Sequence, residues 1–202
     1  MTRTELINSL IKKNNYKSYL EIGVNTPAQP GYNWVGINVE LKHGVDPNVD
    51  TTYRVTSDEF FEKHIKQKYD IIFIDGLHLF EQVYKDIINS LKCLNNNGII
   101  VVHDCNPETE ITQRRERVTS AWHGDVWKAI VKLRIEEENL EIYTVNTDEG
   151  CGIIKVGKQK TLIINEKDDI NDYNFLNNNR LKALNLISVN EFKNKFLSNE
   201  YE

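Results

Sequence analysis

The sequence predicts an α/β protein whose doubly wound, mostly parallel sheet ends in a C-terminal antiparallel hairpin. Residues 69–75 (YDIIFID) and 99–104 (IIVVHD) are apolar at consecutive positions, which is typical of central parallel strands covered on both faces. Between them, apolar residues recur at intervals of three and four over 80–94, the pattern of an amphipathic helix. Segments 140–146 and 152–157 flank the turn TDEGC and predict the hairpin. Such alternation of strand and helix favours a sheet with helices on both faces.

The N-terminal part of the chain extends the same alternation. Apolar spacing predicts a helix over 4–14, and a short apolar strand follows at 18–24. Residues 25–34 contain two prolines and a glycine, so we expect a loop there. Residues 42–47 (KHGVDP) predict another short strand that stops at the Asp-Pro pair.

Several local signals predict where the neighbouring elements begin and end. Residues 52–57 are β-branched and aromatic and predict a third strand, after which Ser57 is positioned to cap a helix. The run NNNG at 95–98 predicts the end of a helix with Gly98 in the left-handed conformation. A further helix is expected over 124–138.

The C-terminal segment is expected to extend one domain that spans the whole chain, 1–202. Its core is predicted at about 15–157, and a helical extension follows at about 160–202. Within the extension, TLIIN predicts a short strand, and Ser188 with Glu191 has the spacing of a capping box.

Composition limits the classes of protein to which the chain can belong. Of the 202 residues, 40% are hydrophobic and 27% charged, and the formal net charge is -5. This acidic balance argues against a nucleic-acid partner, and no apolar run approaches the roughly 20 residues of a membrane span. Three widely spaced cysteines form neither a disulfide framework nor a zinc motif, and the N-terminus lacks the apolar stretch of a signal peptide. We therefore expect a cytoplasmic protein without a membrane span.

Polar residues follow each predicted parallel strand. In open α/β sheets, ligands bind outside the carboxyl ends of the strands. The residues expected at this edge are Glu21, Gly23, Asn25, Asp46, Ser57, Asp58, Asp75, His78, His103 and Asp104. Helix capping explains one or two of these positions but not all five strand ends, so a functional site is predicted at this edge.

Asp46, at the end of the second strand, is suited to accept hydrogen bonds from both hydroxyls of a ribose. The alternative is a turn-forming aspartate before Pro47. A glycine-rich GxGxxG turn is absent, and prolines occupy the region where a dinucleotide needs one for its pyrophosphate. A nicotinamide oxidoreductase is therefore disfavoured, whereas a ligand without that phosphate is compatible with this loop.

The motifs YLEIGVN, HGVDP, TYRVTSDEFF, YDIIFIDGLH, GIIVVHDCNP and WHGDVWKAIVKLR occur in an order that resembles a known group. From about residue 18 to 157 the chain looks like the class I S-adenosylmethionine-dependent methyltransferases, with their Rossmann-like fold, that are found with surface-glycan biosynthesis genes. The resemblance implies S-adenosylmethionine as cofactor. The resemblance and the strand ends together imply that Glu21, Gly23 and Asn25 lie around the methionine part of the cofactor. Asp46 is expected at the ribose, and Ser57 and Asp58 near the adenine. Asp75 is also expected to contact the cofactor. The first loop departs from the family pattern, because Gly23 is its one glycine before Pro27.

Asp75, His103 and Asp104 form a candidate metal site across two neighbouring strand ends. Two carboxylates and an imidazole suit a divalent cation, Mg²⁺ or another. The arrangement is similar to that of metal-dependent O-methyltransferases, in which a cation orients the acceptor hydroxyls and lowers their pKa. The alternative is that the two acids cap helices or contact the cofactor without a metal.

His78 is the first candidate for a general base, since an imidazole titrates near neutral pH. His103 is the second candidate, and Asp75 is expected to orient the acceptor. The alternative for His78 is an ordinary residue at a helix N-terminus. Between the fifth strand and the next helix, Trp122, His123 and Asp125 combine an aromatic face with hydrogen-bonding groups and are expected to contact a sugar ring.

These observations predict an S-adenosylmethionine-dependent methyltransferase that methylates a hydroxyl of a sugar or glycan precursor. The alternative is a catalytically inactive methyltransferase fold that binds a nucleoside or glycan precursor. The sequence leaves open the identity of the acceptor, the requirement for a metal and whether the chain forms a homo-oligomer.

Overall fold

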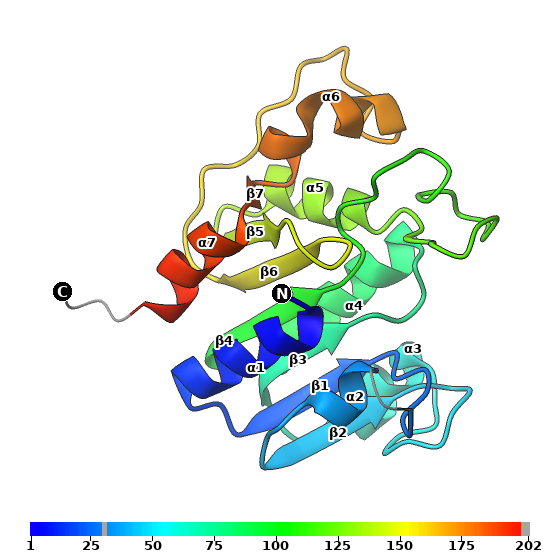
Figure 1. Cartoon of the computed structure of the whole chain (residues 1–202), viewed down its shortest axis with the longest axis vertical. Coiled ribbons are helices and arrows are strands. Elements are labelled where there is room, and N and C mark those ends of the chain that lie inside the picture. The colour runs from blue at the N-terminus through cyan, green and yellow to red at the C-terminus, as the bar shows by residue number, and fades with distance from the viewer. Residues whose placement is uncertain (30–31, 199–202) are drawn as a thin grey trace.

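A seven-stranded sheet crosses the middle of the molecule in the strand order β2-β1-β3-β4-β6-β5-β7 (Figure 1). The computed structural model describes residues 1–29 and 32–198. The strands are β1 Ser18–Ile22, β2 Leu41–Val45, β3 Tyr69–Ile74, β4 Leu94–Val102, β5 Leu140–Val145, β6 Cys151–Val156 and β7 Leu186–Ile187. Strands β2, β1, β3 and β4 are parallel, and β6 joins them antiparallel to both β4 and β5. The predicted fold class, with its parallel sheet and closing hairpin, is confirmed.

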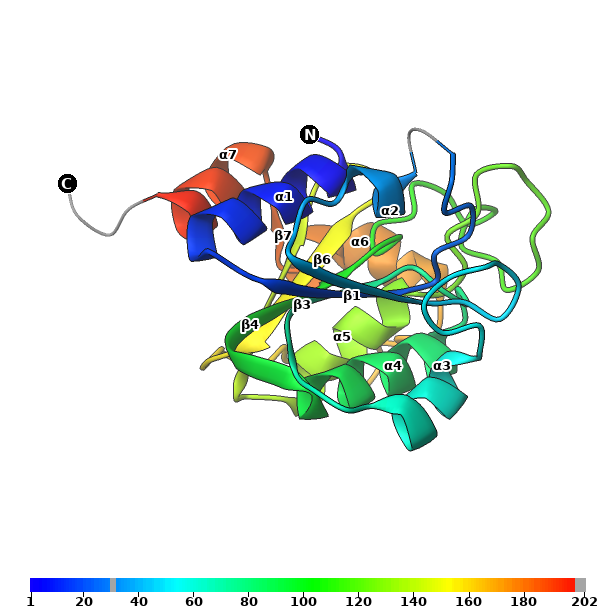
Figure 2. The same cartoon turned by 90° about the horizontal axis from the view of Figure 1, so that it is seen from below.

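Helices cover both faces of the sheet. They are α1 Arg3–Asn14, α2 Asn33–Gly36, α3 Ser57–Glu59, α4 Phe80–Lys92, α5 Trp127–Glu136, α6 Tyr173–Ala183 and α7 Val189–Phe192, and two π-helical turns, η1 Phe60–His64 and η2 Lys193–Leu197, continue α3 and α7. Figure 2 shows α1, α2 and α7 on one face and α3, α4 and α5 on the other. The loops after β1, β2 and β4 all project from the same end of the sheet, on the right of that view.

Each face of the sheet has its own hydrophobic layer, because successive strand residues point to opposite sides. In β3, Ile71 and Phe73 pack toward α1 and α7, whereas Ile72 and Ile74 pack toward α4 and α5. The C-terminal extension contributes to both layers: Phe192 of α7 is fully buried in the first, and Phe175 and Leu176 of α6 are buried in the second. The predicted capping box of Ser188 is present and starts α7.

The predicted strand at 52–57 is wrong. Its side chains alternate between more and less exposed positions, as in an extended edge, but the backbone makes a single parallel bridge, between Tyr53 and Val45. The chain then turns into α3, which is capped by Thr56 rather than by Ser57. The Thr56 hydroxyl accepts from the Glu59 backbone N–H at 3.2 Å.

The prediction for NNNG at 95–98 is also wrong. Asn97, not Gly98, takes the left-handed conformation, with φ 64°, and the run lies inside β4 at an irregularity in its register with β3. Gly98 is needed for another reason, since a Cβ there would lie 2.9 Å from the carbonyl oxygen of Asp70.

Two further predictions for segments without regular structure need correction. Residues 161–165 form no strand, and the Leu162 N–H donates instead to the carbonyl of Arg134 at 2.7 Å. The loop expected at 25–34 is interrupted by the start of α2, and its residues 30 and 31 lie outside the described part of the chain.

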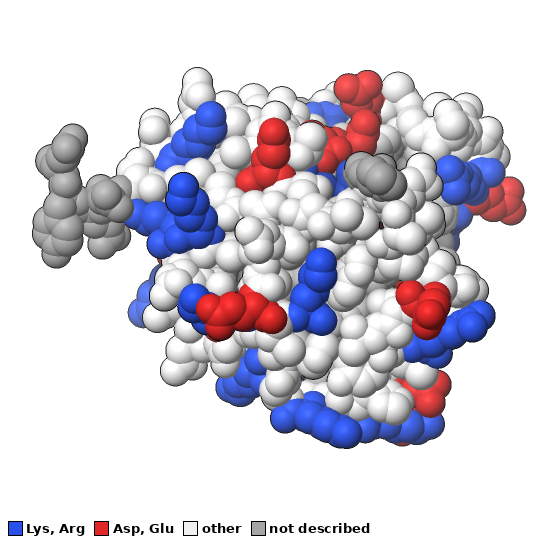
Figure 3. Space-filling view, turned by 60° about the horizontal axis from the view of Figure 1, so that its bottom comes forward, with Lys and Arg blue, Asp and Glu red and all other residues white. Residues whose placement is uncertain are grey.

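Two observations concern the predictions that were made about a membrane and a nucleic-acid partner. In the part of the chain that the structure describes, no helix is both long and apolar enough to cross a bilayer. On the face shown in Figure 3, basic and acidic side chains are scattered with uncharged surface between them.

Candidate active site

A cavity of about 690 Å³ opens at the carboxyl ends of the parallel strands. Its wall contains all seven residues expected to contact the cofactor and all those expected to act in catalysis or bind a metal: Glu21, Gly23, Asn25, Asp46, Ser57, Asp58, Asp75, His78, His103 and Asp104. The sheet therefore brings together residues that are spread over more than 80 positions of the sequence, as the rule for open α/β sheets requires.

One end of the cavity is built around a buried carboxyl on β1. Glu21 is 2% exposed, and its Oε2 accepts from the Tyr19 hydroxyl at 2.6 Å and from the Asn33 amide at 3.3 Å. Burial raises the pKa of the Glu21 carboxyl to about 8, and the hydrogen bond from Tyr19 offsets only part of that effect. A nearby ammonium group would compensate the charge of this carboxylate.

Gly23 ends β1 in a conformation that excludes a side chain. Its φ is 88°, and a Cβ there would lie 2.2 Å from the carbonyl oxygen of Asp75. The glycine thus lets the loop after β1 cross directly over the end of β3, which brings the backbone to the floor of the cavity.

Asp46 holds two loops together at the end of β2. Its Oδ2 accepts from the Asn25 N–H at 3.0 Å and its Oδ1 accepts from the Asn48 N–H at 2.8 Å. Asn25 itself has φ 57°. The bond from Asn48 forms the turn around the Asp-Pro pair, which is the alternative role for Asp46. The Asp46 carboxylate also lines the cavity, where a ribose is expected.

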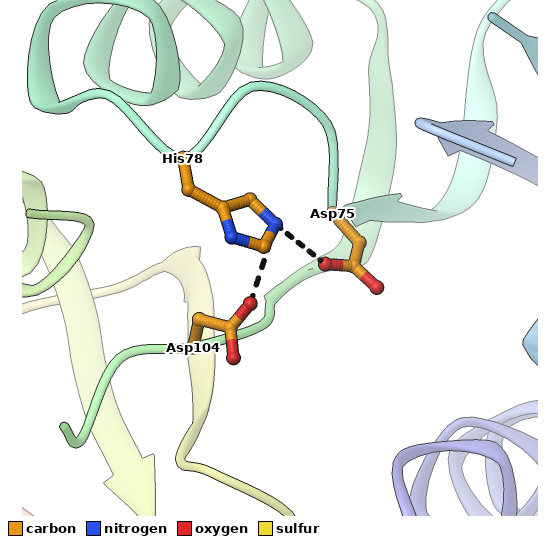
Figure 4. A group of neighbouring side chains, drawn as sticks. All are labelled: Asp75, His78 and Asp104. Atoms are coloured by element: carbon orange, nitrogen blue, oxygen red, sulfur yellow. Dashed lines mark hydrogen bonds and ion pairs between the residues drawn. The ribbon is translucent and has the colours of Figure 1, made fainter. Parts of the chain in front are cut away.

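The acid–imidazole cluster of Asp75, His78 and Asp104 lies in the wall of the same cavity (Figure 4). His78 Nε2 is 3.3 Å from Asp75 Oδ1 and 3.3 Å from Asp104 Oδ2. Asp104 reaches this place through a left-handed backbone, with φ 60°. Within the described residues, these three are the ones whose ligand atoms have metal-binding spacing.

Both ring nitrogens of His78 face hydrogen-bond acceptors. Nδ1 lies 3.1 Å from the carbonyl oxygen of Trp122, so Nδ1 carries a proton and Nε2 points at the two carboxylates. Burial lowers the pKa of His78, but the hydrogen bond to Asp75 and the charge of Asp104 outweigh it and raise the pKa above its usual value. The two carboxylates therefore favour the protonated form of the His78 ring.

His103 touches the same acids from the other side. Its Nδ1 is 3.2 Å from Asp104 Oδ2 and 3.4 Å from Asp75 Oδ1, but its Nε2 faces Asp148 and Arg3, at 3.7 and 3.4 Å. Burial lowers the pKa of His103, and the charge of Asp75 and the bonds to Asp104 and Asp148 raise it well above its usual value. His103 Nδ1 therefore faces the same two carboxylate oxygens as His78 Nε2, and the metal set of Asp75, His103 and Asp104 stays a prediction beside the cluster that contains His78.

Arg3 lines the cavity and pairs with Asp148, and neither residue was expected there from the sequence. Arg3 starts α1, and Asp148 lies in the turn of the β5–β6 hairpin, where it has φ 45°. Arg3 Nη1 donates to Asp148 Oδ1 at 3.3 Å, and Arg3 Nε lies 3.9 Å from Asp75 Oδ2. The feature that could have indicated a role for Asp148 is the run of consecutive left-handed residues in this turn, because strained backbone often marks a functional site.

The opposite end of the cavity is formed by α3 and α4. The Gln82 amide lies within 3.1 Å of Ser57 Oγ, Asp58 Oδ1 and Asp86 Oδ1. Asp58 is also paired with Lys85 at 2.7 Å. Gln82 and Asp86 were not predicted from the sequence, although their spacing of four residues places both on one face of the helix.

Of the three residues expected to bind a sugar, only Trp122 lines the cavity. Its ring stacks on His78, with 4.9 Å between centroids. Asp125 is 1% exposed and caps α4 instead, since its Oδ1 accepts from the Phe80 N–H at 2.7 Å. His123 is also buried and lies behind the site, with Nε2 2.7 Å from Glu149 Oε2 and 3.9 Å from Asp104 Oδ1.

Comparison with known proteins agrees with this geometry. Residues 7–105, just under half of the chain, match a protein family described as a methyltransferase domain. No curated protein matches the sequence. The match ends just past β4, so it includes the residues of the cavity wall that follow β1, β2, β3 and β4.

Several solved structures share the fold. A Staphylococcus aureus protein provisionally described as a caffeoyl-CoA O-methyltransferase has a TM-score of 0.58 and 21% identity, over 76% of this chain and 82% of its own. A methyltransferase of Podospora anserina with bound S-adenosylhomocysteine has a TM-score of 0.57 and 14% identity, with coverage of 77% and 78%. An O-methyltransferase of Bacillus cereus, also with S-adenosylhomocysteine, has a TM-score of 0.54 and 16% identity, with coverage of 78% and 82%.

The fold is that of the class I methyltransferases, with the sheet order and closing hairpin described above. Residues 7–105 are thus similar to a methyltransferase domain, and the chain shares its fold with O-methyltransferases of known structure.

Proposed function

We propose that the protein transfers the methyl group of S-adenosylmethionine to a hydroxyl oxygen of a small molecule, a sugar or glycan precursor. The observation that carries this proposal is the position of the acid–imidazole cluster of Asp75, His78 and Asp104. It borders the donor cavity where the acceptor has to meet the methyl group. Bound in the cavity, S-adenosylmethionine supplies the electrophilic methyl group. The wall then orients both reactants for in-line transfer.

The donor atoms of the cluster fit a divalent cation. His78 Nε2 has two carboxylate oxygens at 3.3 Å, and its other nitrogen is fixed by the Trp122 carbonyl. A histidine that binds a metal through one ring nitrogen typically donates a hydrogen bond from the other ring nitrogen. One nitrogen with two oxygens favours Mn²⁺, Fe²⁺ or Zn²⁺ over Mg²⁺, which prefers oxygen alone. A cation held by these three residues would lower the pKa of the acceptor hydroxyl.

This arrangement favours cation binding over general-base catalysis by His78. Two flanking carboxylates favour the protonated ring, whereas a general base has to be unprotonated when it accepts the hydroxyl proton. The same argument applies to His103, whose pKa is raised by Asp75. In the proposed reaction His78, Asp75 and Asp104 would hold the cation that orients the acceptor, and the hydroxyl proton would leave to water in the open cavity. His103 with Arg3 neutralises the surplus acid charge.

A sugar or glycan precursor as acceptor is supported by two residues at the mouth of the cavity. Trp122 offers an aromatic ring, which suits the apolar face of a sugar. Arg117, in the same loop, is exposed and lines the cavity, and within the described residues its hydrogen bond goes to the Ser120 carbonyl rather than to an acid. Its guanidinium suits the phosphate of an activated sugar.

The experiment is a binding titration followed by a turnover assay. We expect the purified protein to bind S-adenosylhomocysteine, and to form it from S-adenosylmethionine when nucleotide sugars are supplied with Mn²⁺. Asp46→Ala should weaken binding at least tenfold, because it removes the ribose acceptor. Asp50→Ala, an exposed acid of the same loop outside the cavity wall, is the matched control. The donor assignment is wrong if the wild-type protein binds neither compound.

The acceptor assignment has its own test. Catechols, simple sugars and nucleotide sugars are offered in parallel, and formation of S-adenosylhomocysteine is followed. Turnover on catechols alone would contradict the sugar acceptor. Binding of the donor product without turnover on any hydroxyl would favour the inactive binding module.

A further inference from the structure

The C-terminal extension reaches back toward the candidate active site through α6 (Figure 1). The match to a methyltransferase domain ends at residue 105, so it includes neither this helix nor the loop after β4. The Arg180 guanidinium donates from Nη1 to Asn106 Oδ1 at 2.6 Å and to the carbonyl oxygen of Pro107 at 2.8 Å. Both acceptors follow closely after Asp104, an acid of the candidate cluster. The helix therefore holds the chain directly downstream of that acid.

Tyr173, at the start of α6, adds a second contact to the same segment. Its hydroxyl donates to the carbonyl oxygen of Glu108 at 2.7 Å and accepts from Arg180 Nη2 at 3.0 Å. The hydrogen bonds of the Arg180 guanidinium within the described residues thus go to neutral oxygens, those of the loop and of Tyr173. Because a guanidinium presents its donors in a rigid planar fork, these bonds fix the direction of the loop as well as its distance.

The β5–β6 hairpin holds this segment from the other side. The Cys105 N–H donates to the carbonyl of Gly150 and the Asn106 N–H to that of Glu149, both at 3.0 Å. A Cβ on Gly150 would lie 2.4 Å from the Cβ of Asn106, so the packing here is close. Asp104, just ahead, has a left-handed backbone with φ 60°. A non-glycine residue keeps such a conformation where its surroundings enforce it, which the contacts on both sides of the segment do.

Resting on the function proposed above, we propose that Arg180 is a positioning residue for the acceptor side of the reaction. By holding residues 105–108 against the hairpin, it sets the Asp104 carboxylate at 3.3 Å from His78 Nε2. The same segment begins the loop that carries Trp122 to the cavity wall. The C-terminal extension thereby shapes the part of the site where the acceptor hydroxyl binds.

The donor side of the cavity should not depend on this contact. Glu21 and Asp46 line it from the ends of β1 and β2, and residues 105–108 are not part of its wall. Loss of the Arg180 side chain should therefore weaken the acid cluster and leave donor binding unchanged. A residue that only stabilised the fold would affect both sides of the cavity alike.

The variants separate the shape of the side chain from its charge. Arg180→Met removes the guanidinium, whereas Arg180→Lys keeps the charge and loses the planar fork. Lys182→Met is the matched control, because it removes the same charge from the same helix. The Lys182 amine donates to the carbonyl of Ile163 at 3.0 Å and so contacts a different segment.

The test measures two affinities on each variant of the whole chain. Binding of S-adenosylhomocysteine is followed by calorimetric titration, and binding of Mn²⁺ by electron paramagnetic resonance of the free ion. We expect Arg180→Met to bind Mn²⁺ about 10-fold more weakly, as on loss of a partner that orients a metal ligand, and to bind S-adenosylhomocysteine like the wild-type protein. Arg180→Lys should lie between the two, and Lys182→Met should match the wild type. Unchanged Mn²⁺ binding in Arg180→Met, or an equal loss of both affinities, overturns the inference.

A milder variant gives a readout that needs no ligand. Tyr173→Phe removes the hydroxyl alone, and hydrogen exchange is followed by mass spectrometry on a peptide that spans residues 103–108. These amides should exchange about 3- to 10-fold faster than in the wild-type protein, as expected for one lost hydrogen bond, and those of β3 should not change. Equal exchange over 103–108 in the two proteins overturns the inference while the proposed function stands. Wild-type protein that binds no S-adenosylhomocysteine overturns the proposed function and this inference with it.

Discussion

The carbonyl oxygen of Asp75 occupies the space that a side chain at Gly23 would need, since a Cβ on residue 23 would lie 2.2 Å from it. This contact joins the ends of β1 and β3 at the floor of the cavity. The two strand ends can approach this closely because residue 23 has no side chain.

Gly23→Ala should therefore disturb both stability and the site. The left-handed backbone costs alanine about 1–2 kcal/mol, and the overlap with Asp75 adds about 1–3 kcal/mol. We expect a loss of about 2–5 kcal/mol in the free energy of unfolding, measured by urea denaturation. Gly76→Ala is the control, because the nearest atom to a Cβ there is 3.6 Å away. Equal stability of the two variants would contradict the contact.

Binding of the donor should release a proton from Glu21. Its pKa of about 8 leaves most of the carboxyl protonated at pH 7, and the ammonium group of the ligand favours the ionised form and lowers that pKa. Titration with S-adenosylhomocysteine at pH 7 in buffers of different ionisation enthalpy should show release of close to one proton. Glu21→Gln should show none, and Glu40→Gln, an exposed acid, should behave like the wild-type protein. Heats that do not depend on the buffer would argue against this role.

Removal of divalent cations should abolish turnover without abolishing donor binding. Treatment with a chelator is expected to reduce the rate at least 100-fold, and Mn²⁺ should restore it. Asp104→Asn should weaken Mn²⁺ binding by about 10- to 100-fold, followed by electron paramagnetic resonance of the free ion. Glu116→Gln, in the exposed loop after β4, serves as the charge-matched control. Full activity in the presence of the chelator would rule out the cation.

The C-terminal extension should contribute strongly to stability through Phe192. This ring is fully buried between α1 and the sheet, so Phe192→Ala should lower the free energy of unfolding by about 3–5 kcal/mol. Leu181 is 73% exposed, and Leu181→Ala should change the free energy of unfolding by less than about 0.5 kcal/mol. Thermal and urea denaturation measure both. A small effect at residue 192 would mean that the extension is not part of the folded core.

Asp86→Asn should stabilise the ligand-free protein in a pH-dependent way. Burial raises the pKa of Asp86 from 3.8 to about 6, so the folded protein keeps this proton in a range where the unfolded chain has released it. The free energy of unfolding of the wild type therefore falls as pH rises from about 4 to 6. The free energy of unfolding of the variant does not fall in this way. The variant should therefore become more stable than the wild type by an amount that grows to about 2–3 kcal/mol over that range and stays constant at higher pH. An advantage that does not vary with pH would contradict the raised pKa.

The strand ends were predictable because parallel strands deliver their last residues to one edge of the sheet. Glu21, Asp46 and Asp75 follow directly from that rule. Side chains that reach the cavity from elsewhere were not predictable, since nothing local sets their distance from it. Gln82 and Asp86 project from a helix face, and their presence in the wall depends on how α4 packs.

The loop after β4 shows the limit of reasoning from composition. Trp122 and Asp125 are three residues apart and look equally suited to a sugar. The fold separates them, because Asp125 satisfies the free N–H groups at the start of α4. The strand prediction for 52–57 was wrong for a related reason. The sequence pattern indicates which side chains are covered, but a strand also needs a backbone partner along its whole length, and this segment makes a single bridge.

Arg3 and Asp148 are 145 positions apart in the chain. During synthesis at about 5–20 residues per second, roughly 7–30 s pass between the appearance of the guanidinium and that of its partner. Over that interval the strands that carry Asp75 and Asp104 can pair, but the hairpin that neutralises Arg3 does not yet exist. A nascent chain that ends after β4 therefore carries Arg3, Asp75 and Asp104 but not Asp148, the acid with which Arg3 pairs in the complete fold.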